Sequence, residues 1–317
     1  MIILSMFDGI SCGQLALNRL GVNIEKYYAY EIDKNAIKIT NKNFPNTIQL
    51  GDVENISIDT IKNMEKIDLI LAGSPCQGFS RAGLGLNFED TRSKLFFKFV
   101  EVLNWIKEYN NKDVKFLLEN VKMKKEWENT ISQYVGVEPI EINSKLVSAQ
   151  NRSRLYWTNI KGITVPKDKN IKLMDILEDI KLESYTVKDN VKLCNSLSEN
   201  SKNLVSVVDG EVRINQAVKK GYIVANNGDG VNLSFPTSKT RRGRVLKEKS
   251  SCLDTQCEVC VYYNKSIRRL NINELEKLQT LPAGYTKGIS EINRMKVIGN
   301  AWTVDVVVHI LSFLLNI

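Results

Sequence analysis

Short apolar runs alternate with amphipathic segments along the first 160 residues. The apolar runs have the length of buried strands and occupy residues 2–7, 27–30, 67–72 and 114–118. Two segments between them, 14–20 and 34–43, have helical character. Apolar residues from Leu95 to Ile106 recur at helical spacing and would share one face of a longer helix. Strands alternating with helices predict βαβ units, and therefore an α/β domain with a parallel sheet.

The pattern changes after about Pro166. Residues 167–265 are polar and rich in Asn, Lys and Ser, with short β-like pieces such as YIVANN and CVYY. Helical patterning returns after Arg268 in LNINELEKLQTL, and a last helix is expected over about 303–315. We therefore predict an α/β domain over 1–164, a smaller, mostly irregular or β domain over 165–265, and a return to the first domain over 266–317.

The composition excludes several classes of protein. The sequence contains no run of about 18 apolar residues, so it predicts no membrane-spanning helix. The apolar start lacks a basic region and runs into Asp8, which argues against a signal peptide. Six cysteines are too few for a disulfide scaffold, so we expect reduced thiols in a cytosol-like compartment. The single pair Cys257 and Cys260 is too little for a zinc site, and no metal is expected.

The chain contains one histidine, His309, in an apolar segment that predicts a packed helix. We expect a core or edge residue there, and the count excludes a histidine-based triad, a multi-histidine zinc site and HExxH proteases. Acid–base chemistry must then use carboxylates, Cys, Lys or Tyr. The net charge of +8 suits a polyanionic partner, although an AT-rich genome also favours Lys and Asn.

Polar residues or turns follow four of the predicted strands. They are Asp8-Gly9, Glu31, the turn GSPC and Glu119-Asn120. In open parallel sheets, ligands bind beyond the carboxyl ends of the strands. The order of these segments therefore predicts a nucleotide-like site, a cysteine and a carboxylate at one edge of the sheet.

The segment FDGISCG reads as a glycine-bearing turn between strand and helix, and alone it is a weak signal. Glu31 stands where a carboxylate would meet ribose hydroxyls, or it is an ordinary surface residue. Asp52 in GDV could reach an adenine amino group. No P-loop is present, so phosphoryl transfer from ATP has little support.

Cys76 lies in GSPCQGFS, after a proline turn at the end of a strand. A lone cysteine is usually structural, but this position suits an exposed nucleophile. Glu119 follows four apolar residues, and partial desolvation there would favour its protonated form. The alternative interpretation of Glu119 is a helix cap.

Arg152 and Arg154 in QNRSR are two positions apart before a β-like run, so they would point to one face of a strand. Two guanidiniums on one face could bind a phosphate or a base carbonyl. The alternative interpretation is that they lie at a solvated edge of the sheet. Residues 239–249 hold six basic residues against one glutamate, a net charge of +5. This run is either a solvated loop or a phosphate-contacting loop, in which Gly243 would permit close approach to a backbone.

Together these segments resemble the DNA cytosine-5 methyltransferase family. The family's ordered blocks appear as FDGISCG, YEID, GDV, GSPCQGFS, FEDTRSKLFF, ENV, QNRSR, RRLNINELEKLQTLP and GNAWTVDVV. They cover about 1–160 and 268–317, and residues 165–265 match only in position, as the variable target-recognition region. The first block departs from the usual FxGxGG and the last from GNSV, which alters side chains in the cofactor pocket but keeps its glycines.

The resemblance implies a Rossmann-like, S-adenosylmethionine-dependent methyltransferase that methylates C5 of cytosine in a short DNA sequence. Cys76 matches the nucleophile that adds to C6, and Glu119 the proton donor to N3. Arg154 matches the contact to the cytosine carbonyl, assisted by Arg152. The base must be flipped out of the duplex. Gln77 and Ser80 belong to the loop that would close on DNA.

The cofactor S-adenosyl-L-methionine would be held by residues that match the family's contact positions, namely Phe7, Asp8, Gly9, Glu31, Ile32, Asp52, Pro75, Leu95, Asn300 and Ala301. We expect Arg241, Arg242 or Arg244 to read a base and the lysines of 239–249 to contact phosphates.

Two alternatives remain: a tRNA cytosine-5 methyltransferase on the same scaffold, and a catalytically silent DNA-binding regulator of the same ancestry. The long recognition segment favours duplex DNA over tRNA, and the presence of Cys76 and Glu119 argues against a silent protein. We expect a monomer in the cytoplasm of a bacterial cell, encoded there or by a phage, with a cognate restriction endonuclease if it serves restriction–modification.

Overall fold

The computed structural model describes residues 1–74, 94–180, 183–256 and 259–315. A seven-stranded sheet organises the first part, in the order β3-β2-β1-β4-β5-β7-β6. Its strands are β1 (Ile2–Met6), β2 (Lys26–Tyr30), β3 (Ile48–Gly51), β4 (Leu69–Ala72), β5 (Lys115–Val121), β6 (Ile140–Asn143) and β7 (Ser153–Thr158). Strands β1 to β5 are parallel, which confirms the α/β class.

The sheet is not parallel throughout, because β7 runs antiparallel to both β5 and β6. Only residues 144–152 connect β6 to β7, with the 3-10 turn η2 (Ser144–Leu146) among them. A parallel pairing would need a crossover of about a dozen residues or more, so the short connection leaves the antiparallel arrangement.

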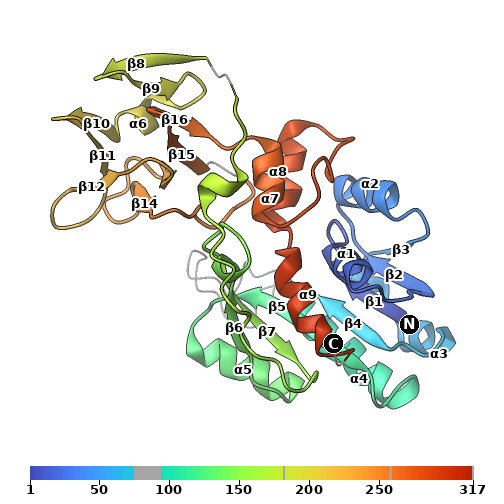
Figure 1. Cartoon of the computed structure of the whole chain (residues 1–317). Helices are drawn as coiled ribbons and strands as arrows, with labels where there is room; N and C mark the ends of the chain where they lie inside the picture. The colour runs from blue at the N-terminus through green and yellow to red at the C-terminus, as the bar shows by residue number, and fades with distance from the viewer. Residues whose placement is uncertain (75–93, 181–182, 257–258, 316–317) are drawn as a thin grey trace.

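Helices cover both faces of this sheet (Figure 1). The helices of this part of the molecule are α1 (Cys12–Arg19), α2 (Lys34–Asn43), α3 (Ile58–Asn63), α4 (Lys94–Tyr109), α5 (Lys125–Val135), α7 (Ile272–Leu278), α8 (Glu291–Asn300) and α9 (Val304–Ser312), with the 3-10 turn η1 (Val53–Asn55). Alternate residues of β1 divide between two cores. Ile3 packs in the core that includes α1 and α9, and Leu4 packs in the core that includes α4. The period of two along a strand explains this division.

Residues 184–269 form a second lobe with its own strands, drawn apart from the large sheet in Figure 1. A six-stranded sheet has the order β14-β13-β15-β16-β9-β8, and a three-stranded sheet the order β10-β11-β12. The elements are β8 (Ser184–Lys188), β9 (Val191–Cys194), α6 (Glu199–Lys202), β10 (Val205–Val208), β11 (Glu211–Asn215), β12 (Tyr222–Ala225), β13 (Gly230–Asn232), β14 (Arg244–Leu246), β15 (Val259–Tyr263) and β16 (Ser266–Arg269).

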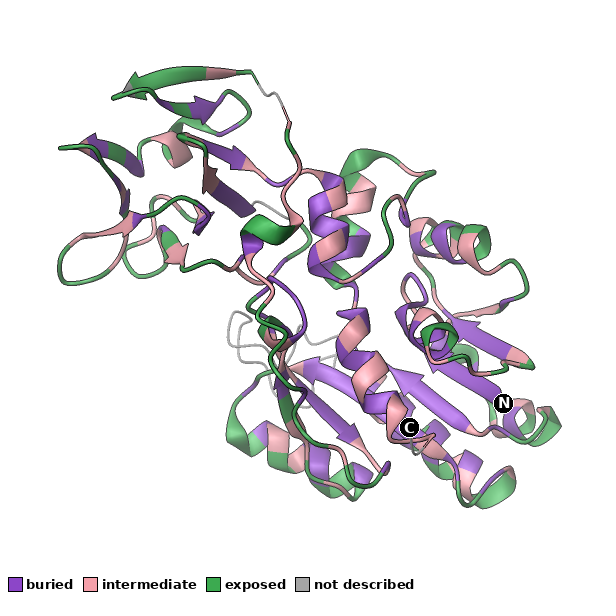
Figure 2. Cartoon of the chain, in the orientation of Figure 1, coloured by how far each residue is buried: buried purple, intermediate pink, exposed green. Residues whose placement is uncertain are grey.

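A separate cluster of buried apolar side chains lies inside this second lobe, including Val207, Ile214 and Ile267. Figure 2 shows buried positions alternating with exposed ones along several of its strands. The connection from β7, which contains the 3-10 turn η3 (Leu173–Ile176), instead contributes Leu173 to the first lobe's core. We call residues 184–269 the recognition lobe, after the target-recognition region expected there from the sequence, and the remainder the sheet lobe.

Three smaller observations complete the fold. His309 lies at the edge of the core, where its ring Nε2 hydrogen-bonds the Thr164 carbonyl at 2.7 Å, as an edge residue would. No helix in the described ranges is both long and apolar enough to cross a membrane. Across those same ranges, no group of three or more His, Cys, Asp or Glu side chains could hold a metal ion.

Candidate active site

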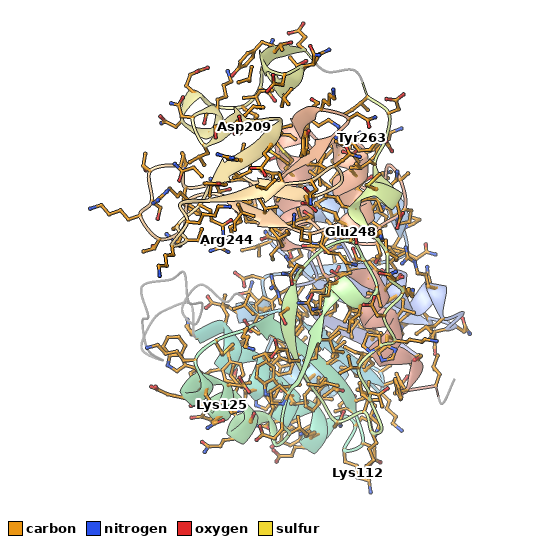
Figure 3. The ribbon with its side chains drawn as sticks, turned by 60° about the vertical axis from the view of Figure 1, so that its left-hand side comes forward. Lys112, Lys125, Asp209, Arg244, Glu248 and Tyr263 are labelled. Atoms are coloured by element: carbon orange, nitrogen blue, oxygen red, sulfur yellow. The ribbon has the colours of Figure 1, made fainter. Side chains whose placement is uncertain are left out.

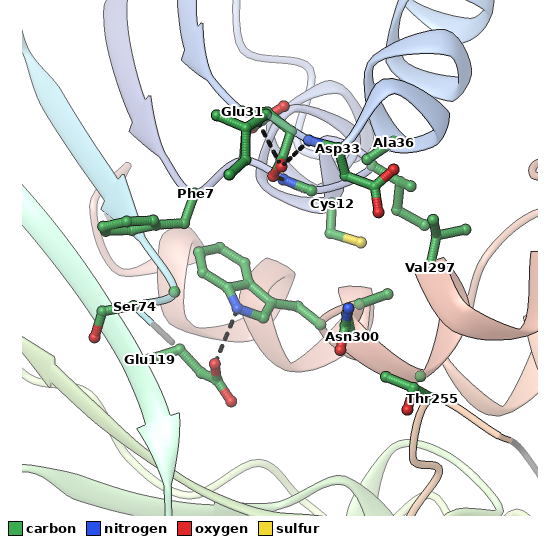
Figure 4. Close-up of a pocket in the computed structure, with 18 of the residues that line it drawn as sticks. Phe7, Cys12, Glu31, Asp33, Ala36, Ser74, Glu119, Thr255, Val297 and Asn300 are labelled. Atoms are coloured by element: carbon green, nitrogen blue, oxygen red, sulfur yellow. Dashed lines mark hydrogen bonds between the residues drawn. The ribbon is translucent and has the colours of Figure 1, made fainter. Parts of the chain in front are cut away.

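A cavity of about 920 Å³ opens at the carboxyl ends of the parallel strands, where the strand order predicts a ligand site. It gathers segments that are far apart in the chain. Its lining includes the expected residues Phe7, Asp8, Gly9, Glu31, Ile32, Asp52, Leu95, Glu119, Arg152, Arg154, Asn300 and Ala301. Figure 4 shows Glu31 and Glu119 on opposite sides of the cavity. Pro75, Cys76, Gln77 and Ser80 lie outside the described residues.

The Glu31 carboxylate joins the first two strand-end turns. One oxygen accepts the Gly9 N–H at 2.8 Å, and the other accepts the N–H groups of Ile32 and Asp33, each at 2.8 Å. Gly9 has a φ of +59°, a conformation that costs glycine little. A carboxylate has about four acceptor positions, so three backbone bonds leave room for one more donor, such as a ribose hydroxyl.

The Asp8 carboxylate is turned inward, although the residue borders the cavity. It accepts hydrogen bonds from Ser5 Oγ at 2.6 Å, from the Tyr27 hydroxyl at 2.8 Å and from Ser11 Oγ. Burial raises its pKa to about 6, against these hydroxyl donors, which act to lower it. The side chain therefore fixes the shape of the first turn.

Glu119 lies within β5 rather than after it, because β7 pairs with β5 as far as Val121. The helix-cap interpretation is therefore wrong. One carboxylate oxygen lies 2.9 Å from Arg154 Nε, and the other accepts the Trp302 indole N–H at 3.1 Å. Figure 4 marks the second bond. These two donors hold the carboxylate at the wall of the cavity.

Neighbouring residues connect Glu119 to the end of β4. The Asn120 amide donates to the Ser74 hydroxyl at 3.1 Å, next to the segment that contains Cys76. Gly73 lies directly against Trp302, since a Cβ added there would be 2.9 Å from the indole nitrogen. A side chain at position 73 would displace the indole that bonds Glu119.

Arg152 lies just before β7 and is buried, so the solvated-edge interpretation is wrong for it. Its guanidinium donates to the carbonyls of Leu253 at 3.0 Å, Ala301 at 3.1 Å and Gly299 at 3.4 Å. Arg152 thereby fastens two segments, 252–254 and 299–302, across the cavity.

Sequence reasoning missed two residues of this site, Trp302 and Cys252. Trp302 stands inside the block GNAWTV, whose departure from the family pattern was the available signal. Cys252 lies in no recognisable pattern, yet its sulfur is 3.4 Å from Arg152 Nη1 and 3.7 Å from Arg154 Nη2. Only the fold brings residue 252 to residues 152 and 154.

The basic run 239–249 is not one loop, because β14 begins inside it at Arg244. Arg244 and Arg241 are exposed, and Arg241 stacks over the Phe235 ring with 4.6 Å between Cζ and the ring centroid. Arg242 instead binds Asn215 Oδ1 at 3.0 Å within the lobe. Figure 3 places Arg244 at the lower edge of the recognition lobe.

Two expectations about this run need correction. Lys249 donates to the carbonyls of Lys145, Ser148 and Ile171, so it contacts the protein itself rather than being held out for phosphate. Lys247 pairs with Asp229 at 2.7 Å, although its side chain is largely exposed. At Gly243 a Cβ would be 2.1 Å from the Asn215 carbonyl oxygen. Close packing inside the lobe therefore requires this glycine.

The doubly wound sheet, with its cavity at the carboxyl edge, has the arrangement in which α/β proteins bind nucleotide-like ligands. A family model described as C-5 cytosine-specific DNA methylase matches residues 1–316, and the chain belongs to that family. The expected enzyme class, DNA (cytosine-5-)-methyltransferase, is thereby confirmed.

Individual relatives agree with the family. The chain is 28% identical to Type II methyltransferase M1.ScrFI of Lactococcus lactis subsp. cremoris, over 99% of this chain and 78% of that protein. It is 26% identical to Type II methyltransferase M.NlaX of Neisseria lactamica, over 96% and 93%. The structure of the Entamoeba histolytica methyltransferase EhMeth matches the fold with a TM-score of 0.66, at 18% identity over 100% and 98% of the two chains.

Proposed function

We propose that the protein transfers a methyl group from S-adenosylmethionine to C5 of a flipped cytosine in a short duplex DNA sequence, through a covalent bond between Cys76 and C6 of the base. The observation that carries this proposal is the Glu119–Arg154 pair, held at 2.9 Å in the cavity that also contains Glu31 and Asp52. A carboxylate and a guanidinium are the groups that can meet N3 and the carbonyl of cytosine.

The far side of the cavity suits the cofactor. Glu31 retains acceptor capacity for a hydroxyl, and Asp52 lies at the end of β3. Ile32 borders the cavity with 70% of its surface exposed, and an apolar side chain so placed suits the face of an adenine ring. Phe7, Asp8, Gly9, Leu95, Asn300 and Ala301 complete this side in the proposal, together with Pro75. The cofactor supplies the methyl group.

The residues of the chain carry the remaining steps in the proposal. The Cys76 thiolate adds to C6 while Glu119 holds a proton at N3, and C5 becomes nucleophilic. Arg154, with Arg152 behind it, binds the cytosine carbonyl and keeps the ring in place. After transfer, the C5 proton leaves to a base and the C6–S bond breaks, which restores the thiolate. Each step needs the base outside the stack, because a duplex hides its ring.

The recognition lobe supports duplex DNA as the substrate. It has its own core and exposes Arg241 and Arg244, side chains suited to guanine O6 and N7. In the proposal these arginines, with Arg242 and with Gln77 and Ser80 of the sheet lobe, contact DNA. The type II relatives support a role in restriction–modification. In the proposal the protein acts as a monomer in the bacterial cytoplasm, beside a cognate endonuclease.

The test compares substrates directly. The purified full chain is incubated with labelled S-adenosylmethionine and either a library of random duplexes or total tRNA, followed by bisulfite sequencing. We expect 5-methylcytosine at one short duplex sequence. Methylation of tRNA alone would replace DNA as the substrate, and no transfer to either, with DNA still bound, would indicate a silent regulator.

A further inference from the structure

Cys252 differs from Cys12, which also borders the cavity. Its sulfur lies between Arg152 Nη1 at 3.4 Å and Arg154 Nη2 at 3.7 Å. For Cys12 the largest effect is burial, which raises the pKa of its thiol to about 12. Burial acts in the same direction on Cys252, yet the two guanidinium charges outweigh it, and the pKa of the Cys252 thiol is lowered.

The charges around Cys252 leave a place for a negative sulfur. Arg152 otherwise bonds neutral carbonyl groups, and Arg154 pairs with Glu119. In the described part of the chain, these two guanidiniums thus have one carboxylate partner between them, and the sulfur also lies 3.4 Å from the Leu253 carbonyl oxygen. Tyr156 on β7 adds no charge near neutral pH, because burial raises its pKa. A thiolate at Cys252 would balance the second guanidinium.

We propose that Cys252 is a positioning residue whose sulfur, seated between Arg152 and Arg154, holds the Arg154 guanidinium in line with Glu119. The role rests on the proposed function, in which Arg154 binds the cytosine carbonyl. Without the sulfur, the partners of Arg154 among the described residues are Glu119 and the Ser153 carbonyl, bonded at 2.9 Å by Nη1, and its Nη2 end loses a contact. Arg154 would then present its donors to the base in more than one orientation.

The first test measures the state of the sulfur without any turnover. In the Cys76→Ser chain, iodoacetamide labelling is followed by mass spectrometry from pH 6 to pH 9, with Cys12 as the internal control. We expect Cys252 to react at least about tenfold faster than Cys12 at pH 7. We also expect its labelling rate to fall less than tenfold for each pH unit below pH 8. Equal rates at the two cysteines would overturn the proposal.

The second test separates charge from shape. Serine at 252 resembles cysteine in shape but is neutral, whereas aspartate carries a charge that two guanidiniums can bind. We expect Cys252→Ala and Cys252→Ser to lower kcat about tenfold with the KM for S-adenosylmethionine within about twofold, and Cys252→Asp to recover part of kcat. A serine variant as active as wild type, with aspartate worse than alanine, would indicate packing alone and refute the positioning role.

The two readouts also separate this proposal from the proposed function. If the wild-type chain methylates no cytosine, the proposed function fails, while the labelling experiment still reports whether the sulfur is held between the arginines. If the chain methylates DNA and Cys252→Ala has wild-type kcat, only the positioning role fails.

Discussion

The arginines of the two lobes are held in opposite ways. Arg152 and Arg154 are enclosed at the cavity and bonded to carbonyls, a carboxylate and a sulfur, whereas Arg241 and Arg244 are exposed on the recognition lobe. Groups that must meet one ring in one orientation need fixed partners. Groups that meet DNA must remain accessible to it, since sequence is read at base edges in the groove. The difference separates residues that build a site from residues that present a surface.

The largest expected effect lies at the nucleophile. Cys76→Ser should lose methyl transfer by several orders of magnitude while keeping DNA and cofactor binding, because only the covalent step is removed. A duplex containing 5-fluorocytosine should trap a covalent complex with the wild type only, as seen by gel electrophoresis and peptide mapping. Trapping at Cys12 instead would contradict the assignment of the sheet lobe's chemistry.

Next in size is the acid of the site. Glu119→Gln keeps the volume of the side chain and removes the proton donor, so turnover should fall roughly 10²- to 10³-fold with cofactor affinity little changed. Single-turnover rates measure the loss of turnover, and a binding titration measures cofactor affinity. Glu199→Gln, an exposed change on α6, is the matched control and should behave as wild type. Undiminished turnover in Glu119→Gln would assign the carboxylate to structure alone.

Stability should distinguish the buried arginine from the exposed one. Arg152→Ala removes the guanidinium from the carbonyls of Leu253, Gly299 and Ala301, of which Ala301 keeps only the Gln279 amide, and should lower the free energy of unfolding by about 3 kcal/mol. Arg241→Ala removes only a contact with Phe235 and should cost about 0.5 kcal/mol. Urea denaturation of both variants measures the difference. Similar losses would erase the contrast between the lobes.

A pH effect is expected at the first turn of the sheet lobe. The folded-state pKa of Asp8 is about 6 against an ordinary 3.8, so folding binds a proton that the unfolded chain lacks between these values. The contribution of Asp8 to stability is therefore lost as pH rises from about 4 to about 6, by on the order of 3 kcal/mol. Asp8→Asn should remove this slope, measured as the difference in unfolding free energy between the two proteins. Parallel pH profiles would contradict it.

The smallest effects are expected on the recognition lobe. Alanine at whichever of Arg241, Arg242 and Arg244 reads a base should cost about 1–3 kcal/mol on the preferred site and relax the choice of one base. Lys249→Ala should instead lower stability without changing salt dependence, because its ammonium bonds three carbonyls. Methylation of a duplex library at two salt concentrations measures base choice and salt dependence, and urea denaturation measures the stability of Lys249→Ala. If all three arginine variants lost activity equally on every sequence, the result would indicate that this surface binds phosphates and reads no base.

Much of the sheet lobe could be predicted from the sequence, because its signals are local. The spacing of apolar residues and the position of turn residues indicate buried segments and strand ends from a few neighbours, and the motifs around Asp8, Glu31 and Glu119 follow the predicted strands. The carboxyl ends of parallel strands meet at one edge, so the order of strands alone predicts that these residues converge. The cavity lining agrees with that expectation.

The tertiary structure alone decided which partners each side chain meets. Cys252 lies 98 residues from Arg154 in the chain and touches it only because residues 252–254 cross the cavity. Lys249 and Gly243 belong to a basic run whose charge suggests DNA binding. In the structure, however, both are packed against carbonyl groups of residues distant in the sequence. A local pattern records the tendency of a segment to be buried or charged, whereas a contact between distant segments depends on how the whole chain packs.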